Sequence, residues 1–382
     1  MEPGRLDSIH TIEPAFLSGF RLGDWFRLLS ENSFSVDRRF LGRALAATAG
    51  AAVTSILSRF EPSQSLTAHQ EELWKSPVFI LGLPRSGTTH LHNLLFCNPT
   101  FACPSRLDCY NPHTLETFHR LGMPRWLALV PRKKRLVDNV TAGWNSPEED
   151  DLALAVMTVD GPRLGLVFGR RHGHYRRRSP LNPEWDGRSR WQQALAEFTR
   201  KLVRLRGKRL LLKSPWHTTF IPEILTIFPG ARFVTIFRNP VDQVRSLLAA
   251  QAHTAWCALQ EHPPESSRRV AEQSADILRR YFQTRDIIPA QNLTECTYES
   301  LVEAPLPVLE GIHEHLGIPG FQSSCAEIPR RRLAGGYVRN AHPKLSSEEE
   351  TLVWTQFRPL VERGFYTPAP GRKPSSVGEG PR

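Results

Sequence analysis

The chain of 382 residues is long enough to bury a full hydrophobic core, and length alone allows one to three domains. Its 49 Lys and Arg residues outnumber 38 Asp and Glu residues, and the resulting charge of +11 favours anionic ligands or an anionic membrane surface. The six cysteines show no zinc-type spacing, so no metal site is expected. The basic clusters lack an aromatic platform or helix-turn-helix pattern, which argues against nucleic-acid recognition.

Residues 1–72 are predicted to form a helical N-terminal extension. The first residues are polar and acidic without the apolar region of a signal peptide, so a cytoplasmic location is expected. The uncharged run from Ala44 to Leu57 is too short to cross a bilayer, which needs ~20 apolar residues. We expect its apolar helical face to pack against the protein, and docking of residues 41–60 on a membrane surface is the alternative. That face consists of Leu41, Leu45, Ala49, Ala52, Ile56 and Phe60.

Residues 77–89, with the sequence PVFILGLPRSGTT, predict a strand, a tight loop and a helix in succession. Residues 78–81 form a short apolar run typical of a buried strand. Gly82 and Gly87 bracket the loop, and the helix begins at Thr88. This geometry directs backbone N–H groups and the positive end of a helix at an anion, typically a phosphate.

The loop differs from that of nucleoside triphosphatases at one decisive position. Its spacing is close to G-x-x-x-x-G-K-[ST], but Thr88 replaces the lysine and Arg85 lies inside the loop. The missing lysine normally contacts the β- and γ-phosphates of the nucleotide. The loop therefore predicts an anion other than ATP, and a P-loop kinase or nucleotide hydrolase is the less favoured alternative.

Buried strands and amphipathic helices alternate through the rest of a domain predicted over residues 73–366, before a disordered tail at 367–382. The run Ser146-Pro-Glu-Glu-Asp-Asp151 predicts a helix that begins near Glu148 with a capping box between Ser146 and Glu149. Further strands are predicted at 209–212, 232–237 and 292–297. Further helices are predicted at 190–205, 218–228, 240–251, 266–285, 305–316 and 346–364.

Three of the predicted strands lead into a basic residue. They are followed by Arg85, Lys213 and Arg238, either directly or within the next loop. Ligands of open α/β sheets bind beyond the carboxyl ends of the strands. We therefore expect the three cations to converge on one polyanion.

Three segments resemble the nucleotide-binding motifs of the sulfotransferases, in matching order. They are the loop Pro84-Arg-Ser-Gly-Thr-Thr89, the segment Leu212-Lys-Ser-Pro215, and Phe237-Arg-Asn-Pro240 with Ser246. The resemblance covers about residues 75–365 and is greatest to the group of tyrosylprotein sulfotransferases and bacterial homologues. It implies a P-loop-containing three-layer α/β fold, with a mainly parallel sheet flanked by helices. It also implies 3′-phosphoadenosine 5′-phosphosulfate (PAPS) as the donor, with no metal.

The resemblance also assigns roles to individual residues. The 5′-phosphosulfate would be held by Arg85, Ser86, Gly87, Thr88 and Thr89.

The remaining nucleotide contacts would come from later motifs. Arg238 and Ser246 would hold the 3′-phosphate, Tyr298 would lie near the adenine, and Lys213 would approach the sulfuryl group and its bridging oxygen. The segment 336–344 corresponds to a loop that closes over the nucleotide. It offers Arg339, His342 and Lys344 without a firm assignment.

Sulfuryl transfer also needs a base to take the proton of the acceptor hydroxyl. Glu149 and Asp150 are preferred because bacterial relatives carry a similar acidic cluster, with His113 and Asp108 as alternatives. Capping of a helix N-terminus would equally explain the acidic run. Arg85 and Lys213 could stabilise the leaving phosphate.

The acceptor itself is left open by the sequence. A carbohydrate, phenol, lipid or peptide with a hydroxyl, or an amine, would suit the aromatic and arginine-rich region between the loop and Lys213. A non-catalytic module that binds polyanions or membranes is the second alternative. Its binding would follow total charge and weaken with salt rather than depend on Arg85.

Overall fold

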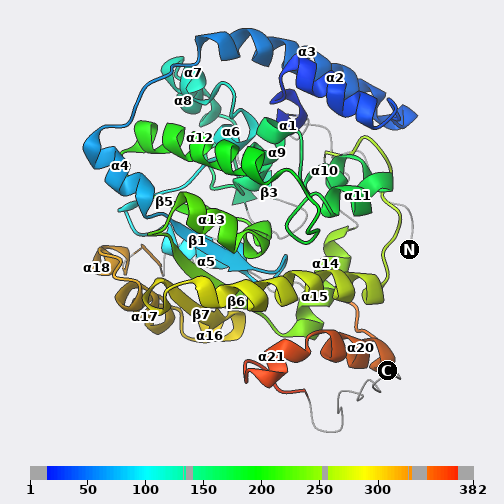
Figure 1. The fold of residues 1–382 in the computed structure, drawn as a ribbon, viewed down its shortest axis with the longest axis vertical. Coiled ribbons are helices and arrows are strands. Elements are labelled where there is room, and N and C mark those ends of the chain that lie inside the picture. The colour runs from blue at the N-terminus through cyan, green and yellow to red at the C-terminus, as the bar shows by residue number, and fades with distance from the viewer. Residues whose placement is uncertain are drawn as a thin grey trace.

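The computed structural model describes residues 15–131, 133–134, 141–251, 257–325, 327–328 and 342–368. A five-stranded parallel sheet lies at its centre in the order β2-β5-β1-β6-β7 (Figure 1). The strands are β1 (Val78–Gly82), β2 (Phe101–Ala102), β5 (Arg209–Lys213), β6 (Arg232–Phe237) and β7 (Leu293–Thr297). The predicted parallel sheet is confirmed, and among its five strands only the two-residue edge strand β2, too short to show a periodicity, was not anticipated. A second, antiparallel pair, β3 (Lys133–Lys134) and β4 (Thr141–Ala142), was not predicted either.

Side chains of β1 alternate between two hydrophobic clusters, one on each face of the sheet. Val78 and Ile80 belong to one cluster, while Phe79 and Leu81 belong to the other. The first is covered by α5 (Thr88–Leu95), α16 (Tyr298–Glu303) and α17 (Pro305–His315). The second is covered by α12 (Arg188–Arg206), α13 (Ile221–Ile227) and α15 (Ser267–Thr284) (Figure 1). The three-layer α/β prediction is therefore confirmed.

The N-terminal region is helical, as predicted, and its apolar side chains enter the main core. It contains α1 (Ala15–Ser18), α2 (Leu22–Glu31) and α3 (Leu41–Leu57). Phe16 and Trp25 are fully buried in the same cluster as the sheet residue Phe79. These contacts show that side chains of the N-terminal helices form part of the main hydrophobic core. The domain boundary at residue 72 stays a prediction.

The predicted orientation of α3 is wrong. Ala47, Ala51 and Thr54 are the buried residues of this helix, whereas Leu45 and Ile56 are exposed. A Cβ added to Gly50 would lie 2.4 Å from the Cβ of Ser18, so α1 and α3 approach too closely for larger side chains at their contact. Close packing therefore selects the face of small residues and turns the large apolar face outward.

Several of the remaining helices were not predicted, and two of the predictions made for the others need correction. Their bounds are α4 (Ala68–Lys75), α6 (Arg106–Tyr110), α7 (Leu115–Arg120), α8 (Met123–Leu127), α9 (Asp151–Thr158), α10 (Leu164–Val167), α11 (His172–Arg176), α14 (Pro240–Gln251), α18 (Phe321–Ser324), α20 (Ser347–Gln356) and α21 (Arg358–Glu362). The helix predicted at 346–364 is two helices, because Pro359 at the start of α21 has no N–H to continue the hydrogen bonds of α20. The predicted tail lies outside the described residues from position 369 onward.

The expected capping box at Ser146 does not form. The Ser146 Oγ instead accepts a hydrogen bond from the backbone N–H of Gly143 at 2.9 Å. The helix α9 begins only at Asp151 and has no side-chain cap. The carboxylates before it are held by side chains of other elements, as described below.

Candidate active site

The loop between β1 and α5 is held in a conformation that depends on Gly87. This residue has a φ of 101°, and a Cβ at its position would lie only 2.5 Å from Cδ2 of Tyr298. Arg85 also has a positive φ, 69°, which costs about 1–3 kcal/mol for a residue with a side chain. Arg238 offsets part of that cost by donating a hydrogen bond from Nη1 to the Arg85 carbonyl at 3.1 Å.

Residues from two distant segments, 238–246 and the start of α16, meet at this loop. Nε of Arg85 donates to Oγ of Ser246 at 3.2 Å, and the Arg238 guanidinium lies 4.6 Å from the centre of the Tyr298 ring. The structure thus brings together Arg85, Gly87, Arg238, Ser246 and Tyr298, all predicted nucleotide-site residues. Their roles in binding stay predictions.

The start of α14 explains why Arg238 and Ser246 lie on the same side. Asn239 begins this helix by accepting hydrogen bonds from the backbone N–H groups of Val241 and Asp242 at 3.1 and 3.3 Å. Ser246 follows about two turns later. Gln243, which the sequence analysis missed, ties α14 to the loop through a 2.7 Å hydrogen bond to the Pro84 carbonyl.

Lys213, at the carboxyl end of β5, lies beside the other end of the loop. Its Nζ is 3.3 Å from Oγ1 of Thr89 and 2.5 Å from Oε1 of Glu149. Its backbone N–H donates to Oδ1 of Asp150 at 3.2 Å. The ammonium group is therefore placed between the start of α5 and the acidic run.

Glu149 and Asp150 occupy different environments although they are adjacent in sequence. Asp150 is fully buried, and its second oxygen lies 2.6 Å from Nε2 of His217. The Glu149 side chain keeps 17% of its surface exposed while it contacts Lys213 and Arg163. Glu149 is thus the more exposed of the two, whereas Asp150 is enclosed by its contacts with Lys213 and His217.

Sequence reasoning missed Arg163 as a partner of this acidic run. Besides Glu149, its guanidinium contacts both carboxylate oxygens of Asp151, at 2.6 and 3.1 Å. The acidic run could have indicated that such a partner exists, because adjacent buried carboxylates require cations from elsewhere in the fold. It could not have identified Arg163. Glu148 satisfies the same need with Arg106 at 3.0 Å.

A model of the sulfotransferase family matches residues 77–323, which is more than half of the chain. The chain belongs to the sulfotransferase family. The matched region contains the loop, the Lys213 and Arg238 segments, the acidic run and Tyr298.

Individual relatives agree with this assignment. The omega-hydroxy-beta-dihydromenaquinone-9 sulfotransferases Stf3 of Mycobacterium bovis and Mycobacterium tuberculosis are each 26% identical to this sulfotransferase over 375 residues, covering 94% of both chains. The crystal structure of STF9 from Mycobacterium avium superposes with a TM-score of 0.60 at 18% identity, covering 94% of this chain and 98% of that one. STF1 from M. tuberculosis gives 0.58 at 17% identity, covering 93% and 94%. At these identities the two solved structures support the fold alone.

Two polar atoms at the loop of this sulfotransferase are buried without a hydrogen-bond partner among the described residues. They are Oγ of Ser86 and Nε of Arg238. Unpaired buried polar groups are costly, and both atoms are of a kind that can donate to phosphate oxygens. The loop therefore fits an anionic group that would satisfy them.

Among the described residues, the hydrogen bonds and ion pairs of His113 and Asp108 do not involve Lys213, the loop or the acidic run. Asp108 caps α6 through Ser105 and is paired with His119 at 2.8 Å and Arg206 at 2.9 Å. His113 is buried, hydrogen bonded to the backbone of Val156 in the second half of α9. These contacts bring neither side chain to the loop between β1 and α5, so the geometry supports His113 and Asp108 as the base less than it supports Glu149.

The environment of His113 predicts a pH-dependent contribution to stability. Burial, with the charges of Arg21 and Lys201, lowers its pKa from 6.5 to about 3. Between these values the unfolded chain binds a proton that the folded chain does not, so stability falls as the pH falls through this window. We expect His113→Asn to reduce that loss by up to about 1.4 kcal/mol per pH unit. Urea unfolding of both proteins between pH 7 and 4.5 measures it, and parallel curves would contradict the prediction.

The segment 336–344, expected to close over the nucleotide, is described only from residue 342. The backbone carbonyls of His342 and Pro343 accept hydrogen bonds from Arg245 on α14. Burial and the nearby charges of Arg85 and Arg238 lower the pKa of His342. His342 therefore lies near Arg85 and Arg238, while Arg339 lies outside the described residues.

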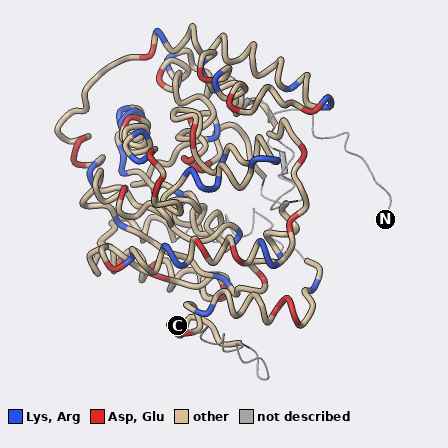
Figure 2. The backbone as a smooth tube through the Cα atoms, turned by 45° about the vertical axis from the view of Figure 1, so that its right-hand side comes forward, with Lys and Arg blue, Asp and Glu red and all other residues tan. Residues whose placement is uncertain are grey.

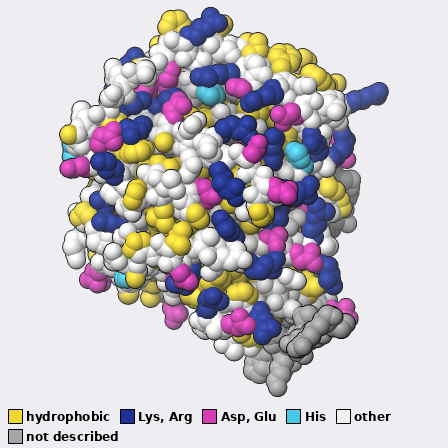
Figure 3. Space-filling view, viewed as in Figure 1, with side chains coloured by type: hydrophobic (Ala, Val, Ile, Leu, Met, Phe, Trp, Pro, Cys, Tyr) yellow, Lys and Arg dark blue, Asp and Glu magenta, His cyan; other side chains and the backbone are white. Residues whose placement is uncertain are grey.

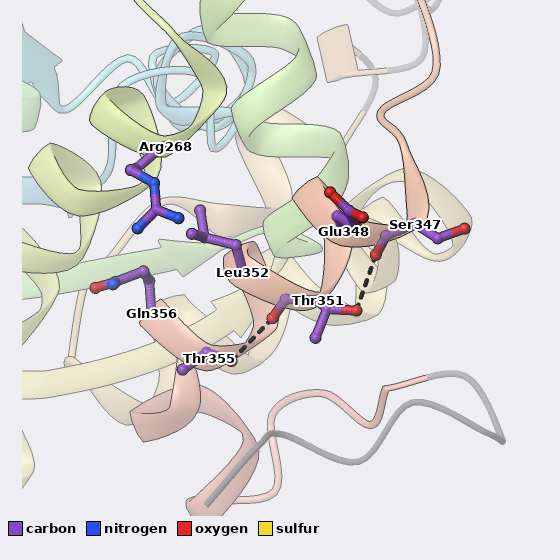
Figure 4. A pocket seen from close by; sticks show the side chains of 7 residues that line it. All are labelled: Arg268, Ser347, Glu348, Thr351, Leu352, Thr355 and Gln356. Atoms are coloured by element: carbon purple, nitrogen blue, oxygen red, sulfur yellow. Dashed lines mark hydrogen bonds between the residues drawn. The ribbon is translucent and has the colours of Figure 1, made fainter. Parts of the chain in front are cut away.

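A shallow hollow of about 530 Å³ between α15 and α20 is separate from this site (Figure 4). Its lining residues are Arg268, Ser347, Glu348, Thr351, Leu352, Thr355 and Gln356. The hydroxyls of Thr351 and Thr355 are bonded to carbonyls of their own helix at 2.8 and 2.9 Å. The hollow contains no predicted catalytic residue and does not compete with the loop as the candidate active site.

Proposed function

We propose that this sulfotransferase moves a sulfuryl group from PAPS to a hydroxyl-bearing acceptor. The observation that carries the proposal is the convergence of Arg85, Lys213 and Arg238, from the ends of three adjacent strands, on one loop. The loop and Thr89 would hold the 5′-phosphosulfate. Arg238 and Ser246 would hold the 3′-phosphate, with the Tyr298 ring beside the adenine.

The arrangement suits in-line transfer. The acceptor oxygen forms a bond to sulfur while the bond between sulfur and the bridging phosphate oxygen breaks. Lys213 and Arg85 stabilise the charge that develops on the leaving phosphate, which such preorganised donors do most effectively away from water. The Glu149 carboxylate takes the acceptor proton, and its neighbour Lys213 places it beside the reacting group.

For the acceptor we propose the terminal hydroxyl of a long-chain lipid. Support comes from the mycobacterial relatives, whose name gives a hydroxylated dihydromenaquinone as their acceptor and which match this chain over 94% of its length. Transfer of radiolabelled sulfate can be compared for a hydroxylated prenyl quinone, a simple phenol and a monosaccharide. Labelling of the phenol or the sugar, with the quinone unlabelled, would reject the lipid acceptor while leaving the sulfotransferase activity intact.

Ligand-induced stabilisation tests the donor. The product nucleotide, 3′-phosphoadenosine 5′-phosphate (PAP), should stabilise the protein by about 2.7 kcal/mol at a hundred times its Kd, whereas ATP with magnesium should not. Arg85→Ala should lose most of this thermal shift, because its guanidinium lies in the loop and pairs with Ser246. Arg268→Ala, which removes an exposed arginine at the separate hollow, serves as the control. A shift with ATP–magnesium alone would reject PAPS as donor.

A further inference from the structure

The helix α3 presents a continuous apolar stripe to solvent. Leu45 is 72% exposed, Ile56 58% and Phe60, just beyond the helix end, 67%. Leu41 and Val53 are also exposed. Apolar side chains line the top edge of the molecule, where α3 runs (Figures 1 and 3). Adjacent exposed apolar side chains that form one stripe are typical of an interaction site.

The polar side of the same helix is bound to the protein. Thr54 Oγ1 donates to the Ser18 carbonyl at 2.9 Å, and Thr48 Oγ1 accepts from the Trp25 indole at 2.8 Å. Ser55 Oγ accepts from the backbone N–H of Leu22 at 2.7 Å. These bonds fix α3 flat on α1 and α2 with its apolar stripe outward.

The length of this segment permits a second arrangement, which the contacts disfavour. The uncharged run 44–57 is too short to cross a bilayer, but the helical segment of residues 38–60 that contains it is long and apolar enough to do so. Only 22% of the most apolar window of that segment is buried. A membrane-spanning orientation would break the three hydrogen bonds to α1 and α2 and expose hydroxyl groups to the hydrocarbon core. An orientation parallel to the membrane surface keeps them all.

The charges around the stripe complement an anionic surface. From residue 38 to residue 60 the sequence contains no Asp or Glu, while exposed Arg38, Arg39 and Arg59 stand at its two ends. Figure 2 shows α3 along the top as an uncharged segment with basic positions toward its ends. Arg39 also pairs with Glu261, so its charge is partly compensated. Basic residues beside an apolar helix face are typical of interfacial helices.

Two further exposed apolar side chains, Trp126 and Leu129, come from the region of α7 and α8, which is joined to the C-terminal end of α3. The carboxylate of Glu61 accepts hydrogen bonds from the backbone N–H groups of Glu116 and Thr117 at 3.0 and 3.1 Å, which joins this end to α7. The next helix, α8, exposes Trp126 by 68% and is followed by Leu129, exposed by 76%. Tryptophan is enriched where proteins meet the lipid interface.

We propose that α3 docks this protein on an anionic lipid bilayer, with its axis parallel to the membrane and its apolar stripe inserted. Leu45, Ile56 and Phe60 would enter the acyl boundary while the flanking arginines contact lipid headgroups. The inference stands on this surface alone and holds whichever acceptor the enzyme uses.

Flotation with lipid vesicles tests the docking. The full chain should float with vesicles of phosphatidylcholine and phosphatidylglycerol, and more weakly with phosphatidylcholine alone. The double variant Leu45→Gln/Ile56→Gln should bind about a hundredfold more weakly, since each buried aliphatic side chain contributes roughly tenfold or more. Ile287→Gln removes an equally large exposed side chain outside this surface and should float like the wild type.

The folding of the double variant and its binding of PAP are measured separately from membrane docking. Because Leu45 and Ile56 are exposed, the double variant should keep the wild-type melting temperature and affinity for PAP in solution. The proposal is overturned if the wild type stays with the soluble fraction on anionic vesicles, or if the double variant floats equally well. It is also overturned if the substitutions convert a dimer to a monomer without affecting flotation, which would assign the stripe to a second copy of the chain.

Discussion

Lys213→Met is expected to lower kcat/KM for sulfuryl transfer by at least about a hundredfold, while the protein stays folded. Methionine has a similar length but carries no charge. The substitution removes the ammonium that lies between Thr89 and Glu149, where charge on the leaving phosphate would be stabilised. Single-turnover transfer of radiolabelled sulfate measures the loss, and Lys213→Arg should recover part of it.

Lys201→Met is a matched control for that substitution. Lys201 is also buried, but its ammonium contacts the Pro112 carbonyl and Glu61, away from the loop. We expect this variant to lose stability without a comparable loss of transfer rate. If the two lysine variants lost activity in parallel with their melting temperatures, Lys213 would be a structural residue and the proposed chemistry would be wrong.

Glu149→Gln is expected to reduce kcat by about 10²–10⁴-fold, the usual contribution of a general base. Glutamine keeps the shape of the side chain but accepts a proton poorly. Affinity for PAP should change little, because the expected nucleotide contacts come from other residues. Glu149→Asp should retain more activity than the glutamine variant. Rapid-quench kinetics and PAP titration separate the two quantities.

Two controls distinguish a base from a positioning residue. Glu148→Gln removes a neighbouring carboxylate that pairs with Arg106, and it should affect the melting temperature more than the rate. His113→Asn tests the rival base and should leave kcat near the wild-type value. A fall in PAP affinity as large as the fall in rate for Glu149→Gln would mean that Glu149 acts by holding Lys213. Loss of activity in His113→Asn with an active Glu149→Gln would move the base to His113.

The sequence by itself determined most of the sheet and the position of the loop between β1 and α5. The strands at 78–82, 209–213 and 232–237 each contain a largely apolar run, as expected for strands buried on both faces. The helix at 240–251 was predicted at its observed bounds. Its start is held locally, since Asn239 accepts a hydrogen bond from the backbone N–H of Val241. Arg85 was identifiable for the same reason, since the loop is defined by residues close together in the chain.

The environments of the acidic run could be decided only by the tertiary structure. Glu149 and Asp150 are adjacent acidic residues that the sequence does not distinguish. In the structure Glu149 contacts Lys213 and Arg163, whereas Asp150 is buried against His217. Their partners come from segments up to 67 positions away. Which carboxylate is exposed therefore depends on how the acidic run lies against Lys213 and His217, which no local pattern encodes.

Which face of α3 is exposed to solvent was likewise determined only by the tertiary structure. Both of its faces are apolar enough to be buried, so periodicity identified the large side chains but could not determine which face contacts the protein. The close approach of Ser18 to Gly50 admits only small residues such as Ala47 and Ala51 at the contact, which leaves Leu45 and Ile56 outside. Hydrophobicity favours burial in general, but the space left between backbones decides which side chains are buried.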